Sequence, residues 1–140
     1  MDNLTRELRE ALAEKHHTMV AQLHQFCNIN SGTTHLAGLI HMHQTLQEAF
    51  RPVADTVESI SFPGIDTINL AGELEVQRVG DALMVSRRPE LSRRILLAGH
   101  MDTVFHAEHP FQQVQYMSDN EINGPGVADM KGGLIVLLHA

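Results

Sequence analysis

The stretch that decides the fold lies at residues 95–105 and reads ILLAGHMDTVF. Residues 95–99 are apolar without alternation, which is typical of a strand buried on both faces in the middle of an α/β sheet. His100 and Asp102 follow directly, and open α/β sheets bind ligands beyond the carboxyl ends of their strands. Residues two apart in extended backbone point the same way. His100 can therefore hold a metal ion through one ring nitrogen while Asp102 accepts a hydrogen bond from the other.

A second stretch, at residues 123–133, reads NGPGVADMKGG and surrounds Asp129 with glycines. Such glycines indicate backbone that bends sharply or approaches another group closely. Taken alone, Asp129 is best interpreted as the N-cap of the helix that follows. A carboxylate in a glycine-rich loop can also bridge two metal ions. The two stretches in this order, with Asp129 29 residues after His100, favour the metal site.

The glycines around Asp129 also suggest a nucleotide-binding loop, but two residues disfavour it. Asp129 stands where the dinucleotide-binding pattern has its third glycine, and its carboxylate would repel a pyrophosphate. Gly132 follows Lys131, where a P-loop requires Ser or Thr. A nucleotide-binding α/β domain is therefore the weakest of the alternatives.

Helices are predicted at both ends of the chain. Apolar residues recur at helical spacing over residues 4–27 and again over 36–50, where the pattern stops before Pro52. Ser31 or Thr33, between the two, could cap the second helix. The apolar run at residues 134–138 predicts the start of a buried helix.

Strands are predicted between these helices. Strand-like residues begin at 57 and are interrupted at 63–64, and alternation at 74–76 and 83–85 predicts a hairpin around 80–81. A further strand ends in a turn at residues 118–120. Together with the buried strand at 95–99, this pattern predicts an α/β fold.

Composition limits the function. The formal net charge of -7 argues against nucleic acid as a partner, because phosphate binding relies on basic patches. No run is long enough for a membrane span, and the N-terminus lacks the apolar segment of a signal peptide. A single cysteine, Cys27, fits a reducing compartment and a buried position. We therefore expect a cytoplasmic protein.

The two stretches, GHMDTV at residues 99–104 and GPGVADMKGG at 124–133, resemble the M20 family of zinc aminoacylases and carboxypeptidases. They are most similar to its glutamate carboxypeptidase branch, and INSGT at 29–33 is similar to the family's opening. The resemblance implies a zinc-peptidase-like catalytic domain with a twisted mixed sheet flanked by helices. Residues 1–140 would form its N-terminal portion, without the lid or dimerisation domain.

The resemblance also implies roles for single residues. His100 would ligate one zinc ion and Asp129 would bridge two. Asp102 would be the catalytic-site carboxylate that orients His100. The peptide bond between Asp129 and Met130 would be cis. The implied activity is hydrolysis of an amide bond next to a free carboxylate, in a small N-acyl amino acid or dipeptide. The complete enzyme would be a homodimer.

The sequence departs from the family pattern in its acidic residues. The family's general base and a further ligand come from a Glu-Glu pair, and no two glutamates are adjacent here. A catalytic zinc usually takes three protein ligands. The chain also stops inside an apolar run. We therefore expect an N-terminal fragment that is inactive alone. The alternative is a non-catalytic binding or assembly module that docks on a partner through its apolar C-terminus.

Overall fold

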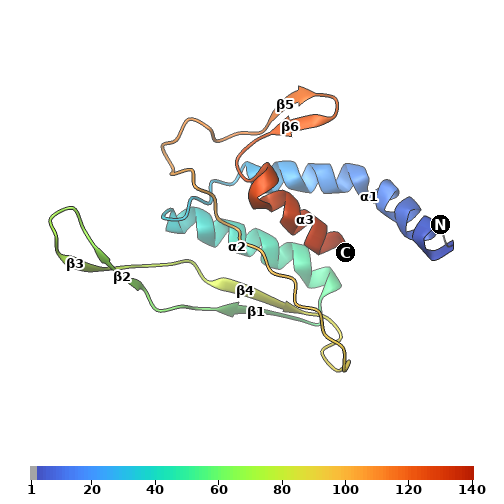
Figure 1. The fold of residues 1–140 in the computed structure, drawn as a ribbon, viewed down its shortest axis with the longest axis horizontal. Helices are drawn as coiled ribbons and strands as arrows, with labels where there is room; N and C mark the ends of the chain where they lie inside the picture. Colours follow the sequence, from blue (N-terminus) through green and yellow to red (C-terminus); the bar gives the residue numbers. More distant parts are fainter. Residues whose placement is uncertain (1–2) are drawn as a thin grey trace.

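The computed structural model describes residues 3–140 (Figure 1). Helices and strands follow the predicted order, helices first, then strands, then a last helix. The helical elements are α1 (Asn3–Cys27), α2 (Leu36–Phe50), the short turn η1 (Arg51–Val53), the irregular turn η2 (Val127–Lys131) and α3 (Gly132–His139). The strands are β1 (Thr56–Ile60), β2 (Ile65–Ile68), β3 (Leu74–Gln77), β4 (Ala82–Ser86), β5 (Gln115–Ser118) and β6 (Glu121–Asn123).

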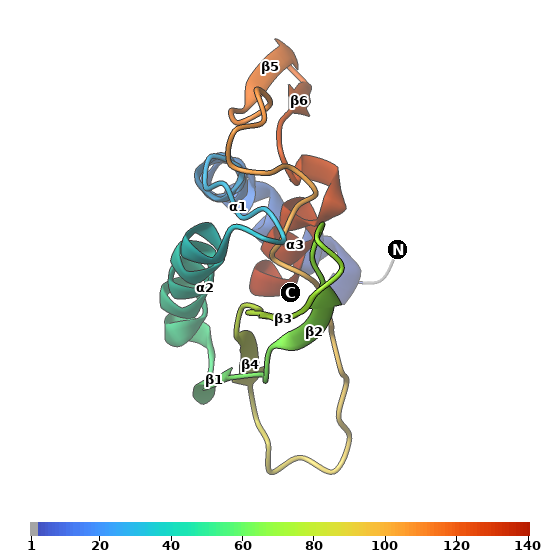
Figure 2. The same cartoon turned by 90° about the vertical axis from the view of Figure 1, so that its left-hand side faces the viewer.

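The hydrophobic core lies among the helices. The short α3 packs against α1, and α2 lies on the other side of the core, next to β4 (Figures 1 and 2). The predicted helices are confirmed, and Cys27 is buried as expected. In α1 only the C-terminal part is covered, since residues 3–18 are exposed. The buried core cluster consists of Phe26, Ile29, Met42, Leu46, Leu134 and Ile135.

The first four strands form two successive antiparallel pairs, together called the ribbon, rather than the predicted hairpin of residues 74–76 with 83–85. β1 pairs with β4, and Ile60 faces Ala82. β2 pairs with β3, and Ile65 faces Gln77. In the sequence, Ile65 is five residues after Ile60 and Gln77 is five residues before Ala82. The hairpin prediction was wrong because the turn forms earlier. The side chain of Asn69 accepts hydrogen bonds from the backbone there, and residues 80–81 lie in a break within the ribbon.

The predicted central strand at residues 95–99 is also wrong in this structure. The segment belongs to no strand, and Ile95 and Leu96 are 87% and 90% exposed. A strand needs hydrogen-bonding partners on its edges. Residues 3–140 place none beside this segment, because the nearby strands pair with one another.

The described residues therefore show a mixed α/β fold without the expected twisted mixed sheet. Their strands form three separate two-stranded antiparallel sheets. The turn predicted at residues 118–120 is confirmed, between β5 and β6. No helix within residues 3–140 is long and apolar enough to cross a membrane.

Candidate metal-binding site

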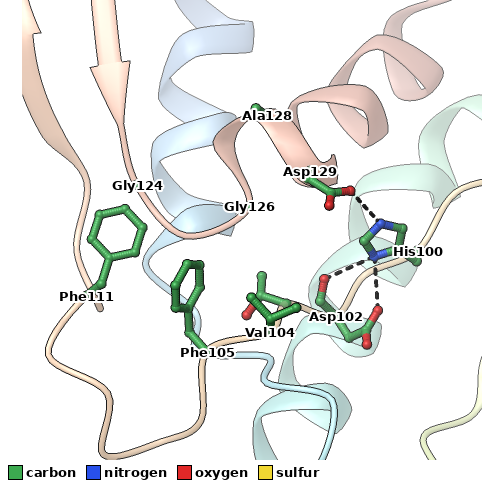
Figure 3. Close-up of a pocket in the computed structure, with 10 residues that line it drawn as sticks. His100, Asp102, Val104, Phe105, Phe111, Gly124, Gly126, Ala128 and Asp129 are labelled. Carbon is green, nitrogen blue, oxygen red and sulfur yellow. Dashed lines mark hydrogen bonds and ion pairs between the residues drawn. The ribbon is translucent and has the colours of Figure 1, made fainter.

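The structure brings the three predicted site residues into contact. His100 lies between two carboxylates, with Asp102 on one side of its ring and Asp129 on the other (Figure 3). Its Nδ1 is 3.0 Å from Oδ1 of Asp102, and its Nε2 is 2.8 Å from Oδ1 of Asp129. The sequence predicted this pairing of one ring nitrogen with Asp102, which leaves the other to face the second carboxylate.

The carboxylates favour the protonated ring of His100. The hydrogen bond to Asp129 is the largest cause that raises the pKa of His100 above its usual value, and Asp102 adds to it. The side chain of Asp129 is 86% exposed, while that of Asp102 is 32% exposed. Asp129, the more exposed carboxylate, therefore lies beside Nε2 at the solvent side of the ring. Asp102, the less exposed carboxylate, holds the ring at Nδ1.

Asp129 is presented by the irregular turn η2. Asp129 and Met130 leave helical backbone angles, and the peptide bond between them is cis, as predicted. No side chain caps α3, so the interpretation of Asp129 as an N-cap does not hold. Its carboxylate contacts His100 instead.

Lys131 anchors this turn, a role that the sequence interpretation missed. Its side chain is fully buried, and Nζ donates to the carbonyl oxygens of Phe26 at 3.0 Å and Ile29 at 2.7 Å. Burial lowers the pKa of Lys131 to about 8. The side chain crosses Gly126, whose φ is 77°, and a Cβ at Gly126 would lie 2.9 Å from Cδ of Lys131. The signal available in the sequence was Lys131 itself, a charged residue within the glycine-rich stretch at 123–133.

The predicted capping residues before α2 do something else. Neither Ser31 nor Thr33 caps the helix, which begins after His35 without a side-chain cap. Ser31 Oγ donates to the carbonyl oxygen of Met101 at 2.7 Å, and Thr33 Oγ1 donates to Asp102. Both hydroxyls therefore reach the first of the two stretches rather than the helix end.

A shallow pocket of about 290 Å³ extends from these side chains. His100, Asp102 and Asp129 line one side, and Phe105 and Phe111 line another (Figure 3). The two phenylalanine rings meet edge to face, with centroids 4.9 Å apart. The pocket therefore joins a polar, charged end to an aromatic wall.

The donor set suits a borderline cation but is incomplete. Zinc takes histidine nitrogen and carboxylate oxygen, and ligating histidines usually donate their other N–H to a carboxylate. His100, Asp129 and Asp102 have this chemistry. Within residues 3–140, however, no group of three or more candidate ligands gathers. The described residues therefore fit part of a zinc site.

The class that this fold and site define is a mixed α/β protein in which one histidine lies between two carboxylates. Residues 96–140, which contain both stretches, match the peptidase family M20/M25/M40. The chain is 35% identical over 89 residues to a succinyl-diaminopimelate desuccinylase of Corynebacterium glutamicum, covering 64% of this chain and 22% of that protein. It is 26% identical over 136 residues to carboxypeptidase G2 of a Pseudomonas species, covering 94% of this chain and 29% of that protein.

A putative succinyl-diaminopimelate desuccinylase of Mycobacterium tuberculosis is 39% identical over 70 residues, which cover 49% of this chain and 19% of that protein. The chain thus spans less than a third of the length of these curated relatives. The predicted resemblance is confirmed, because residues 96–140 match the family and carboxypeptidase G2 is similar over most of this chain.

Proposed function

We propose that this chain is the N-terminal portion of the catalytic domain of an M20-type zinc hydrolase. The carrying observation is the contact of His100 with both Asp102 and Asp129 inside the segment that matches the family. The proposed reaction is hydrolysis of an amide bond next to a free carboxylate, in a small N-acyl amino acid or dipeptide. Two of the similar proteins are named for related activities, a desuccinylase and a carboxypeptidase.

The proposed roles follow from the atoms that face each other. His100 would hold one zinc ion through Nε2, Asp129 would share its carboxylate between two, and Asp102 would keep Nδ1 of His100 protonated. Bound zinc ions supply charge that polarises a carbonyl oxygen and lowers the pKa of water. Phe105 and Phe111 would give the substrate an apolar surface on one side of the pocket.

Residues 3–140 bring only two candidate ligands together, and no glutamate pair is available as the general base. We therefore propose that this chain alone does not hydrolyse amides. In the complete enzyme, which we propose to be a cytoplasmic homodimer, residues 95–99 would be a strand of a twisted mixed sheet. Nucleic acid and membranes are not among the proposed partners.

Zinc titration of the metal-free chain tests this proposal. One weak site is expected, and it should weaken at least about tenfold in His100→Ala and in Asp129→Ala because each removes a ligand. His41→Ala removes an exposed histidine of α2 and should bind zinc like the unchanged chain. Zinc affinity that is unchanged in both His100→Ala and Asp129→Ala would overturn the proposal.

The second candidate is the binding or assembly module. A groove with a mixed apolar and polar lining, formed in part by residues of α2, β4 and α3, favours it, together with the exposed apolar residues at 95–97. Co-purification of a stoichiometric partner, lost on Leu96→Lys, would support this function. A chain that binds zinc through His100 and recruits no partner would exclude it.

A further inference from the structure

The connection between α1 and α2 is docked along the first of the two stretches. Gly32 and Thr103 form a parallel bridge, in which Thr103 N donates to Ser31 O at 2.9 Å and Thr33 N donates to Thr103 O at 3.0 Å. A Cβ at Gly32 would collide with the carbonyl oxygen of Phe105, so the close approach requires glycine. The backbone of Thr33 is therefore held beside Thr103, next to Asp102, by bonds that do not involve its side chain.

The hydroxyl of Thr33 then reaches the carboxylate behind His100. Its Oγ1 is 2.6 Å from Oδ2 of Asp102 and 3.2 Å from the carbonyl oxygen of Thr103. A hydroxyl donates one proton, and the shorter, charge-assisted bond to the carboxylate is the stronger. Asp102 Oδ1 faces Nδ1 of His100 at 3.0 Å. Each carboxylate oxygen of Asp102 thus has its own donor.

We infer that Thr33 is a positioning residue that holds Asp102, and through it His100, in the orientation the site requires. Without the hydroxyl, Oδ2 of Asp102 would lose a donor and the carboxylate could turn about its side-chain bonds. His100 is 46% exposed, so little packing would hold its ring in place. The orientation of Asp102 stands on this geometry alone, whereas its consequence for zinc rests on the proposed function.

Thr33→Val isolates the hydroxyl. Valine has nearly the shape of threonine, the residue is exposed, and the backbone bonds to Thr103 stay in place. Thr33→Ser keeps the hydroxyl and should restore the contact. Thr33→Ala is a second variant without the hydroxyl. Thr34→Val makes the matched change at the adjacent exposed residue and serves as the control.

The first measurement is the set of three-bond Hα–Hβ couplings of Asp102, by NMR, in the metal-free chain with a dispersed amide spectrum. A single rotamer is expected in the unchanged chain, in Thr33→Ser and in Thr34→Val. Averaged couplings are expected in Thr33→Val and Thr33→Ala. A loss of stability alone would not change the Asp102 couplings of the folded protein. If Asp102 keeps one rotamer in both variants without the hydroxyl, the inference is overturned.

The second measurement is zinc affinity in the same variants. Outer partners of metal ligands typically contribute about 10–100-fold to affinity, so about tenfold weaker binding is expected in Thr33→Val, with rescue in Thr33→Ser. Unchanged zinc affinity in Thr33→Val, beside binding that depends on His100, would overturn the step from Asp102 to the ligand. Averaged Asp102 couplings in a chain that binds no zinc would support Thr33 as the holder of Asp102 and overturn the proposed function instead.

Discussion

The helical part of the molecule and the strand ribbon use similar amounts of apolar sequence in opposite ways. Among the helices, Phe26 and Met42 are almost fully buried. In the ribbon, Ile68 and Leu74 are 73% and 80% exposed, although they pair across the strands. The candidate site is supported from the N-terminal helices and their connection, since Lys131 donates to the carbonyl oxygen of Phe26 and Thr33 donates to Asp102. Backbone pairing is the main interaction at this end of the ribbon, whereas hydrogen bonds from distant residues hold the segments that carry the site.

The largest expected difference between the two parts is in stability. Phe26→Ala should lower the free energy of unfolding by about 3–5 kcal/mol, because it leaves a cavity in the core. Leu74→Ala, on the exposed ribbon, should change it by less than about 0.5 kcal/mol. Urea unfolding followed by circular dichroism measures both. Equal losses would mean that the ribbon is packed in solution, contrary to this comparison.

Lys131→Met should lower stability by about 2–3 kcal/mol, since two buried carbonyl oxygens lose their donor. The pKa of Lys131, lowered to about 8 from 10.5, also predicts a pH dependence. Above pH 8 the unfolded chain holds the proton longer than the folded one, so stability should rise with pH.

Cys27 opposes this rise at higher pH. Burial raises the pKa of its thiol from 9.0 to about 11, so above pH 9 the unfolded chain loses its proton first and stability should fall. The window between pH 8 and 9 therefore reports Lys131, with a rise on the order of 1 kcal/mol. Unfolding curves at pH 8 and 9 measure it. A rise that persists in Lys131→Met would assign it to another group.

At the site itself, we expect the affinity for zinc to depend on pH. A proton on Nε2 of His100 competes with the metal, and the raised pKa of His100 extends this competition to higher pH than for an ordinary histidine. Zinc affinity should therefore increase up to about tenfold per pH unit from pH 6.5 until that pKa is passed. Titrations across this range test it. A flat profile would show that His100 is not a ligand.

The last comparison is between two glycines, one at the tip of the ribbon and one beside the site. Gly72 has φ 83°, and no atom lies within 4 Å of the position that a Cβ would occupy there. Gly72→Ala should therefore cost only about 1–2 kcal/mol of backbone strain. Gly32→Ala should cost more, because it would push a methyl group into backbone that carries the site. Thermal unfolding of both variants gives the order. A reversed order would contradict the tight docking of residues 31–33.

The sequence predicted the helices and the site better than the strands, for physical reasons. The helices at 4–27 and 36–50 form their bonds locally, so periodicity was sufficient to predict them. His100 and Asp102 are two residues apart, and their contact follows from local geometry. The apolar run at 95–99 needs partner strands, which residues 3–140 do not place beside it. Thr33 and Lys131 act across about 70 and 100 residues of chain, and no local pattern shows such contacts.

The parallel bridge between Gly32 and Thr103 has a kinetic consequence. It closes a loop of about 70 residues for very few hydrogen bonds, and such non-local closure is slow because chain entropy is lost before contacts compensate for it. The helices α1 and α2 should therefore form first, and the histidine–carboxylate cluster last. Pulse-labelling hydrogen exchange during refolding would show the amide of Thr103 protected after those of α2.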